Sequence, residues 1–244
     1  MEMIHELLGY KNIKIVQRKD MFNFSLDSML LADFVRVKKE NNIIDLGCGN
    51  APIPLFLTMK TKGKIVGVEI QKDVFLLAKK SVELNNFENQ ITIINTDIKG
   101  IYNQVGANAF DVVISNPPYF KYIPSSNINK THFLTIARHE VAITLEDIII
   151  EAKRLLIDSG ALNIIHRTER LSELISLLKT YNFGLRRLKF VYTKTDSENA
   201  LIFMAEARLN RKNDVLVEKP LYVYKNKEEY TDEVKKIFNF KSNI

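Results

Sequence analysis

Short apolar runs rich in β-branched residues alternate with longer helical patterns through the middle of the chain. The apolar runs predict strands at residues 43–46, 64–69, 91–95, 111–115 and 161–166. Helical patterns follow them or precede them, at residues 52–59, 72–85, 101–105, 145–157 and 169–181. Strands and helices that alternate in this way form a parallel sheet covered on both faces, so the pattern predicts an α/β fold.

The alternation stops after residue 181. Two further strands are expected at 186–192 and 200–207, and the polar loop between them, 193–199, is too short for a helix. Strands joined in this way pair as an antiparallel hairpin. The pattern therefore predicts a seven-stranded, mostly parallel sheet whose last strand is antiparallel, with a hairpin that closes one edge.

The two ends of the chain lie outside this alternation. Three features are expected there: a helix at 28–37, a short pair of strands at 215–217 and 221–224, and a basic helix at 232–238. We therefore expect three parts: an N-terminal extension at 1–40 that packs on the central domain, the central domain at 41–207, and a basic C-terminal extension at 208–244. The polar stretch 124–130 is expected to form a loop.

Composition narrows the class of protein. A chain of 244 residues that is 46% hydrophobic can bury a core without disulfides or metal, and its one cysteine, Cys48, excludes a disulfide framework. No apolar run approaches the roughly 18 residues of a membrane span. His5, His132 and His166 lack the spacing of a metal site. We expect a cytoplasmic protein without a metal or a membrane partner.

The net charge of +6 is concentrated near the C-terminus, because residues 186–244 carry 13 basic and 9 acidic side chains. This excess would suit an anionic partner such as RNA, held through its phosphates. The alternative is a solvated surface with no partner. The basic residues proposed to include phosphate contacts are Arg186, Arg187, Lys189, Arg208, Arg211, Lys212, Lys235 and Lys236.

The first strand ends in the loop D-L-G-C-G-N, residues 45–50. Its two glycines allow a sharp turn and close approach of a ligand. A dinucleotide-binding loop would carry a third glycine where this chain has Pro52, so a pyrophosphate is not the expected ligand. Carboxylates at the ends of three strands, Asp45, Glu69 and Asp97, suit a cationic, polyhydroxylated ligand instead.

S-adenosylmethionine is such a ligand, with an amino group, a sulfonium, a ribose diol and no phosphate. Glu69 is expected to accept hydrogen bonds from both ribose hydroxyls. Asp97 is expected to accept a hydrogen bond from the adenine amine. Cys48 is expected to be a small filler, and Asp27 either borders the methionine end or caps the following helix. The expected cofactor-binding residues are Asp27, Asp45, Gly47, Cys48, Gly49, Glu69, Ile70, Asp97, Ile98 and Asn116.

The fourth strand leads into Ser115 and then N-P-P-Y, residues 116–119. The two prolines lack N–H donors, so the Asn116 side-chain oxygen and the Pro117 carbonyl can both accept protons from an amino group. Tyr119 offers a flat face on which a planar group can stack. Orientation and proximity would then provide most of the catalysis. The candidate catalytic residues are Asn116, Pro117, Pro118 and Tyr119.

These motifs carry a family resemblance. D-L-G-C-G-N, followed by V-G-V-E-I and N-T-D-I, resembles the class I S-adenosylmethionine-dependent methyltransferases over residues 41–206. N-P-P-Y at this position resembles the amino methyltransferases. The resemblance implies a Rossmann-like fold, S-adenosylmethionine as cofactor, and one of four target amines: adenine N6, cytosine N4, guanine N2, or the glutamine amide of release factors.

The flanking segments resemble one family more closely, the bacterial tRNA1(Val) (adenine(37)-N6)-methyltransferases. F-N-F-S-L-D at 22–27 and A-R-H-E at 137–140 carry this likeness, and Arg138 and His139 either line the substrate entrance or form salt bridges. The resemblance implies a tRNA partner bound near its anticodon. The alternatives are another amine, in ribosomal RNA, DNA or a release factor, or a non-catalytic RNA-binding protein on the same fold. A release-factor enzyme would need a larger N-terminal domain than 1–40.

Overall fold

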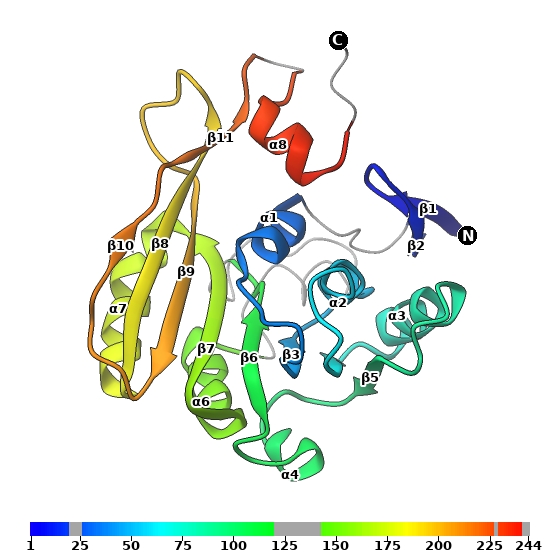
Figure 1. Cartoon of the computed structure of the whole chain (residues 1–244), viewed down its shortest axis with the longest axis horizontal. Coiled ribbons are helices and arrows are strands. Elements are labelled where there is room, and N and C mark those ends of the chain that lie inside the picture. Colours follow the sequence, from blue (N-terminus) through cyan, green and yellow to red (C-terminus); the bar gives the residue numbers. More distant parts are fainter. Residues whose placement is uncertain (20–25, 120–142, 227–228, 241–244) are drawn as a thin grey trace, which may run out of the picture.

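A nine-stranded sheet with helices on both faces forms the centre of the protein (Figure 1). The structure is a computed structural model that describes residues 1–19, 26–119, 143–226 and 229–240. In spatial order the strands are β10 (Leu216–Val217), β8 (Phe183–Lys194), β9 (Ile202–Leu209), β7 (Leu156–Arg167), β6 (Phe110–Ser115), β3 (Ile43–Leu46), β4 (Ile65–Glu69) and β5 (Ile91–Asn95). The remaining strand, β11 (Leu221–Tyr224), pairs with β8 further along its length.

The strands from β5 to β7 pair in parallel, and β9 alone runs antiparallel to its neighbours β7 and β8. The predicted mostly parallel sheet with an antiparallel strand at 200–207 is confirmed, but it has nine strands and not seven, because β10 and β11 join β8. One face carries α1 (Leu26–Phe34), α2 (Pro52–Leu57) and α3 (Lys72–Leu84). The other carries α4 (Tyr102–Val105), α6 (Leu145–Leu155) and α7 (Leu171–Thr180), which follows the 3-10 turn η1 (Thr168–Arg170).

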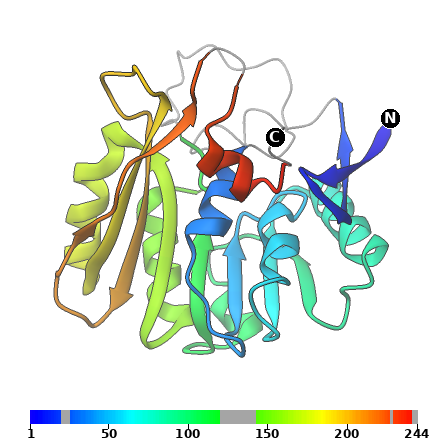
Figure 2. The same ribbon diagram turned by 45° about the horizontal axis from the view of Figure 1, so that its top comes forward.

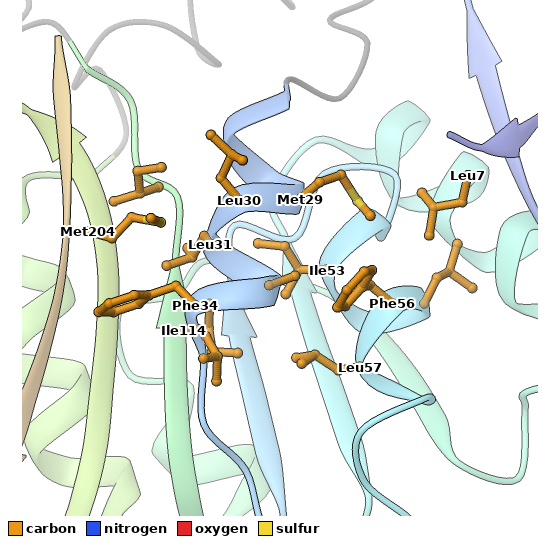
Figure 3. Packing of buried hydrophobic residues seen from close by; sticks show 14 of the residues in the cluster. Leu7, Met29, Leu30, Leu31, Phe34, Ile53, Phe56, Leu57, Ile114 and Met204 are labelled. Atoms are coloured by element: carbon orange, nitrogen blue, oxygen red, sulfur yellow. The ribbon is translucent and has the colours of Figure 1, made fainter. Parts of the chain in front are cut away.

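Helix α1 is anchored near the middle of the sheet by its buried side chains. Figure 3 shows its buried side chains between those of the strands and those of α2: Met29, Leu30, Leu31 and Phe34. The helix ends at Phe34, before the predicted end at residue 37. The Lys60 ammonium accounts for this, because it donates to the carbonyls of Ala32 at 2.9 Å, Asp33 at 2.6 Å and Val35 at 3.2 Å.

The N-terminal hairpin of β1 (Glu2–Leu7) and β2 (Tyr10–Arg18) was not predicted. Polar side chains of α3 bind the outer edge of β2: the Val16 N–H donates to Ser81 Oγ at 2.9 Å. Asn85 accepts from the Lys14 N–H at 2.8 Å and donates to the Lys14 carbonyl at 2.6 Å. These side chains take the place of a neighbouring strand, which leaves this edge satisfied.

The expected pairing of 215–217 with 221–224 is wrong, because β10 and β11 both pair in parallel with β8 instead. The two segments follow each other along the same direction and cover the free edge of β8. The last helix, α8 (Asp232–Ile237), lies close to its predicted position and reaches α1 (Figure 2). Among the described residues, no helix is long and apolar enough to cross a membrane. The division into parts at 1–40, 41–207 and 208–244 and the cytoplasmic location stay predictions.

Candidate functional site

A cavity opens where β3, β4 and β6 end, between the helices that follow them. Parallel strands place their carboxyl ends along one edge of a sheet, which is where such folds bind ligands. Most of the predicted site residues line this cavity: Asp45, Gly47, Cys48, Gly49, Glu69, Ile70, Asp97, Ile98, Asn116, Pro117 and Pro118. Asp27 and Tyr119 are not among its lining residues within the described part of the chain.

The glycine loop turns sharply between β3 and α2. Gly47 and Gly49 have φ angles of 81° and 57°, which L side chains rarely adopt, so glycine is favoured at both positions. The N–H groups of Gly47 and Cys48 both donate to the Val68 carbonyl at 2.9 Å. The loop is thereby fixed against the end of β4.

Cys48 fills space beneath the loop, as predicted of a small filler. Its side chain is 3% exposed, and a β-carbon added to Gly67 would lie 2.8 Å from the Cys48 sulfur. Burial, together with the carboxylates of Asp45 and Glu69, raises the pKa of the Cys48 thiol well above its ordinary value. A protonated, enclosed thiol is a poor nucleophile.

Asp45 is the most unusual group in the cavity. It is 1% exposed, and neither carboxyl oxygen has a hydrogen-bond partner among the described residues. Burial, and then the nearby Glu69 carboxylate, raise its pKa to about 8. A buried acid without a donor is costly, so this position favours a ligand that brings a donor or a positive charge.

Glu69 and Asp97 complete the row of acids. The Glu69 carboxylate accepts from the backbone N–H of Gly49 at 3.1 Å and of Gln71 at 2.8 Å. Burial raises the pKa of Glu69, and those backbone donors offset part of the rise. Asp97 follows β5 and accepts from the Lys99 N–H at 2.9 Å. The three acids thus come from the ends of three neighbouring strands, as the sequence predicts.

The N-P-P-Y loop follows β6 on the other side of the cavity. Ser115 Oγ donates to the Leu46 carbonyl at 2.9 Å and so holds the start of the loop against β3. The Asn116 amide nitrogen donates to Ser28 Oγ at 3.1 Å. No described residue donates to the amide oxygen of Asn116, and Pro117 and Pro118 have no N–H, so this wall presents acceptors.

Tyr119 follows Pro118 at the end of this wall, in contact with Asp27 of α1 and His166 of β7. Its hydroxyl donates to the Asp27 carboxylate at 2.7 Å, and its ring lies 5.5 Å from the His166 ring at an interplanar angle of 36°. Asp27 is therefore placed against the tyrosine, and its expected role at the methionine end of a cofactor stays a prediction. Burial raises the pKa of Asp27, although the Tyr119 hydroxyl lowers it in part.

His166 is fully buried at the end of β7. Burial, and then the charge of Arg170, lower its pKa to about 4, so the ring is neutral at physiological pH. Within the described ranges, no three or more His, Cys, Asp or Glu side chains stand close enough to hold a metal ion. The absence of a metal stays a prediction.

Sequence reasoning missed several residues of the cavity. They include Ser28 from α1, Asn50 from the loop before α2, Ile53 from α2, Val74 from α3 and Ile148 from α6. Ile53 and Val74 could have been found, because both stand one turn or less into helices that follow the predicted loops. Ser28 carried no local signal, since it lies 88 residues from the Asn116 side chain that it contacts.

Arg187 and Arg208, which were expected to contact phosphates, both bind acidic side chains of the protein. Arg187 is buried and binds Glu206 at 2.6 Å and Glu218 at 2.7 Å. Arg208 binds Glu206 at 2.8 Å and pairs in register with Ala161, in the middle of β7. The expectation is therefore corrected for Arg187, which is structural, whereas a phosphate contact at the partly exposed Arg208 stays a prediction.

Most of the other basic residues proposed as phosphate contacts have acidic partners. The pairs are Arg186 with Asp214, Lys189 with Glu233, Arg211 with Asp158 and Lys235 with Glu229. Four further sequence predictions fall outside the described residues: the loop at 124–130, His132, Arg138 and His139.

Comparison with known proteins identifies relatives. A family model described as the methyltransferase small domain matches residues 12–183, more than half of the chain. Two proteins named tRNA1(Val) (adenine(37)-N6)-methyltransferase also align. The one from Shewanella halifaxensis is 29% identical over 161 residues, which is 66% of this chain and 64% of that protein. The one from Dyadobacter fermentans is 26% identical over 216 residues, or 88% of each chain.

Solved structures share the fold. A predicted O-methyltransferase from Agrobacterium tumefaciens superimposes with a TM-score of 0.69 and 22% identity, over 88% of this chain and 96% of that one. The tRNA m1G37 methyltransferase of M. jannaschii superimposes with a TM-score of 0.61 and 17% identity, over 86% of this chain and 57% of that one. These likenesses confirm the predicted class I methyltransferase fold.

Proposed function

Because the chain belongs to the methyltransferase small domain family, and is thus an S-adenosylmethionine-dependent enzyme, we propose that it methylates the N6 amine of an adenine in tRNA. The observation that carries the proposal is the position of Asn116, whose amide borders the same cavity as Asp45, Glu69 and Asp97. An acceptor for an amine thus lies beside the groups that suit the cofactor.

The residues of the cavity fit S-adenosylmethionine. The Asp45 carboxylate has no partner among the described residues and would take the cationic amino group. Glu69 would accept the ribose hydroxyls, and Asp97 the adenine amine, through charge-assisted hydrogen bonds. When bound, the cofactor supplies an electrophilic methyl group on a sulfonium.

On the substrate side, the chain supplies orientation. The Asn116 oxygen and the Pro117 carbonyl would accept the two protons of the target amine and turn its lone pair toward the methyl group. Reaction rates rise steeply when two groups are held at contact distance in the correct geometry. No strong general base is required, because the amine becomes acidic once it has gained the methyl group.

The choice of tRNA adenine rests on the relatives, whose names give adenine 37 of tRNA1(Val) as their target. An adenine has to leave the base stack to reach the cavity, and Tyr119 would provide a face on which it stacks. The unpaired Asp45 beside the N-P-P-Y loop favours an enzyme over a non-catalytic RNA-binding protein on the same fold.

The test is a survey of substrates with isotopically labelled S-adenosylmethionine. Unmodified tRNA, ribosomal RNA, DNA and a release factor are incubated separately with the protein, digested and analysed by mass spectrometry. We expect N6-methyladenosine in tRNA-Val, in the fragment that contains position 37. Label in another substrate, with none in tRNA, would replace the tRNA assignment. An absence of label in every substrate would contradict the proposed activity.

A further inference from the structure

We propose that the first turn of α1 positions the N-P-P-Y loop for catalysis: Ser28 sets the orientation of the Asn116 amide, and Asp27 sets that of the Tyr119 ring. This inference rests on the proposed transfer to an amine. It assigns positioning roles to two neighbouring residues that lie far from the loop in sequence.

The Asn116 amide has one end that donates and one that accepts, and only the accepting end can hold a substrate amine. Its nitrogen donates to Ser28 Oγ at 3.1 Å, which turns the oxygen away from Ser28. Ser28 is 7% exposed and lines the cavity, so it meets the amide within the site itself. Without this contact the amide can rotate and direct its own N–H groups at the substrate.

Tyr119 is held from two directions. Its hydroxyl donates to Asp27 at 2.7 Å, and its ring packs on His166 with centroids 5.5 Å apart. His166 is fully buried and neutral, and its Nδ1 accepts from the Arg167 N–H at 2.8 Å, so the imidazole is fixed. With these contacts the aromatic ring keeps one plane, which is what stacking on a flat substrate requires.

Helix α1 is rigid enough to act in this way. The residues that follow Ser28, from Met29 to Ala32, are at most 1% exposed and belong to the main core cluster, as Figure 3 shows for three of them. Lys60 holds the other end of the helix through three carbonyls. Its first turn is therefore a fixed support for the loop.

The test compares Ser28→Ala in two backgrounds, the wild type and Asn116→Asp. A carboxylate has two equivalent acceptors, so its orientation does not matter, and the effect of Ser28→Ala should shrink in that background. We expect Ser28→Ala to lower kcat for tRNA methylation about 10-fold in the wild type and less than about 3-fold in the Asn116→Asp background. The KM for tRNA and the calorimetric affinity for S-adenosylmethionine should change less than about 3-fold.

Ser176→Ala is the matched control, since Ser176 is an exposed serine on α7 whose hydroxyl donates only to the Ser172 carbonyl among the described residues. Equal losses of kcat from Ser28→Ala in both backgrounds would overturn the orientation role, as would an unchanged kcat.

The role of Asp27 is tested separately. Asp27→Ala should lower kcat to the same extent as Tyr119→Phe, and the variant with both changes should lower it no further. Additive losses would overturn the role of Asp27. If the wild type methylates no amine, the proposed function fails as well.

Discussion

Asp45 is a buried acid of the cavity whose charge state changes with pH near neutrality. It is enclosed without a hydrogen-bond partner in the described structure, and its pKa is raised to about 8 by burial and by Glu69. A raised pKa in the folded state means that ionised Asp45 destabilises the protein. The stability that the neutral acid contributes is therefore fully present below about pH 4, the pKa of Asp45 in the unfolded chain. It is lost as the pH rises through about 8, the pKa of Asp45 in the folded protein.

Asp45→Asn keeps the shape of the acid and removes its titration. Without cofactor, the variant should melt close to the wild type at pH 4 and at least about 5 °C above it at pH 8, by differential scanning calorimetry. The comparison is the difference between the two proteins at each pH, which cancels the titration of other groups. A difference that stays constant from pH 4 to pH 8 would mean that Asp45 is not buried as an unpaired acid.

Glu69→Ala should weaken S-adenosylmethionine binding by about an order of magnitude or more, because charge-assisted bonds to the ribose would be lost. Isothermal titration calorimetry measures this directly. Glu83→Ala serves as the control, since Glu83 is an exposed glutamate on α3 whose side chain is 50% accessible. If both variants bind the cofactor as tightly as the wild type, Glu69 does not belong to the binding site.

Which contacts could be predicted depended on how residues are brought together. Asp45, Glu69 and Asn116 were found because carboxyl ends of parallel strands meet at one edge whatever the details of packing. Arg187 was assigned to the surface because basic side chains are usually solvated. Its burial depends on Glu206 and Glu218, which are 19 and 31 residues away and reach it only once β8, β9 and the following segment are assembled.

At the scale of elements, the hairpin of β8 and β9 fixes where Arg208, Arg211 and Lys212 lie relative to the cavity. Residue 208 lies beside Ala161, and Ile202 lies beside Arg167 at the carboxyl end of β7. Six residues of strand separate the two positions, which is about 20 Å. Arg211 and Lys212 follow β9 and so lie at the edge opposite the cavity.

Arg211→Gln combined with Lys212→Gln should therefore leave the salt dependence of tRNA binding unchanged. If both residues contacted phosphates, the slope of log affinity against log salt would fall by about two units. Filter binding at a series of salt concentrations gives the slope. A fall of one unit or more would place part of the RNA at this edge of the sheet and contradict the geometry argued from the hairpin.

The elements themselves were largely predictable, and the misses have physical causes. β7 begins at Leu156, directly after α6, and so earlier than the predicted strand at 161–166. The short apolar run at this point fits a helix or a strand equally well, and the pairing of Leu156 with Phe110 makes it a strand. The β1–β2 hairpin depends on Ser81 and Asn85 of α3, which bind its edge from about 70 residues away. Neither contact leaves a local pattern.

At the scale of the whole molecule, the two ends of the chain hold each other. The Gly9 N–H donates to the Phe238 carbonyl at 2.9 Å, and Tyr10 Oη donates to the Ile237 carbonyl at 2.9 Å. Val234 and Phe238 join the same core cluster as Leu7 and the residues of α1. The N-terminal hairpin and the last helix thus support α1, which in turn supports the site.

Gly9→Ala should loosen this junction. The added β-carbon would lie 2.3 Å from the Asn239 carbonyl oxygen, so the backbone has to move. We expect a loss of about 1–3 kcal/mol in the free energy of unfolding, measured by urea denaturation. Asn12→Ala, at an exposed position of β2, is the control. Equal stability of the two variants would show that the ends do not meet as described.

In the proposed reaction, the protein transfers a methyl group to an amine that Asn116 holds in this cavity. The most direct test is single-turnover methylation of tRNA by Asn116→Ala, with cofactor affinity measured on the same protein. We predict that methyl transfer falls roughly 100-fold or more, the scale of lost positioning at a reacting centre, while S-adenosylmethionine affinity stays nearly unchanged. Full methyl transfer by Asn116→Ala would contradict the claim.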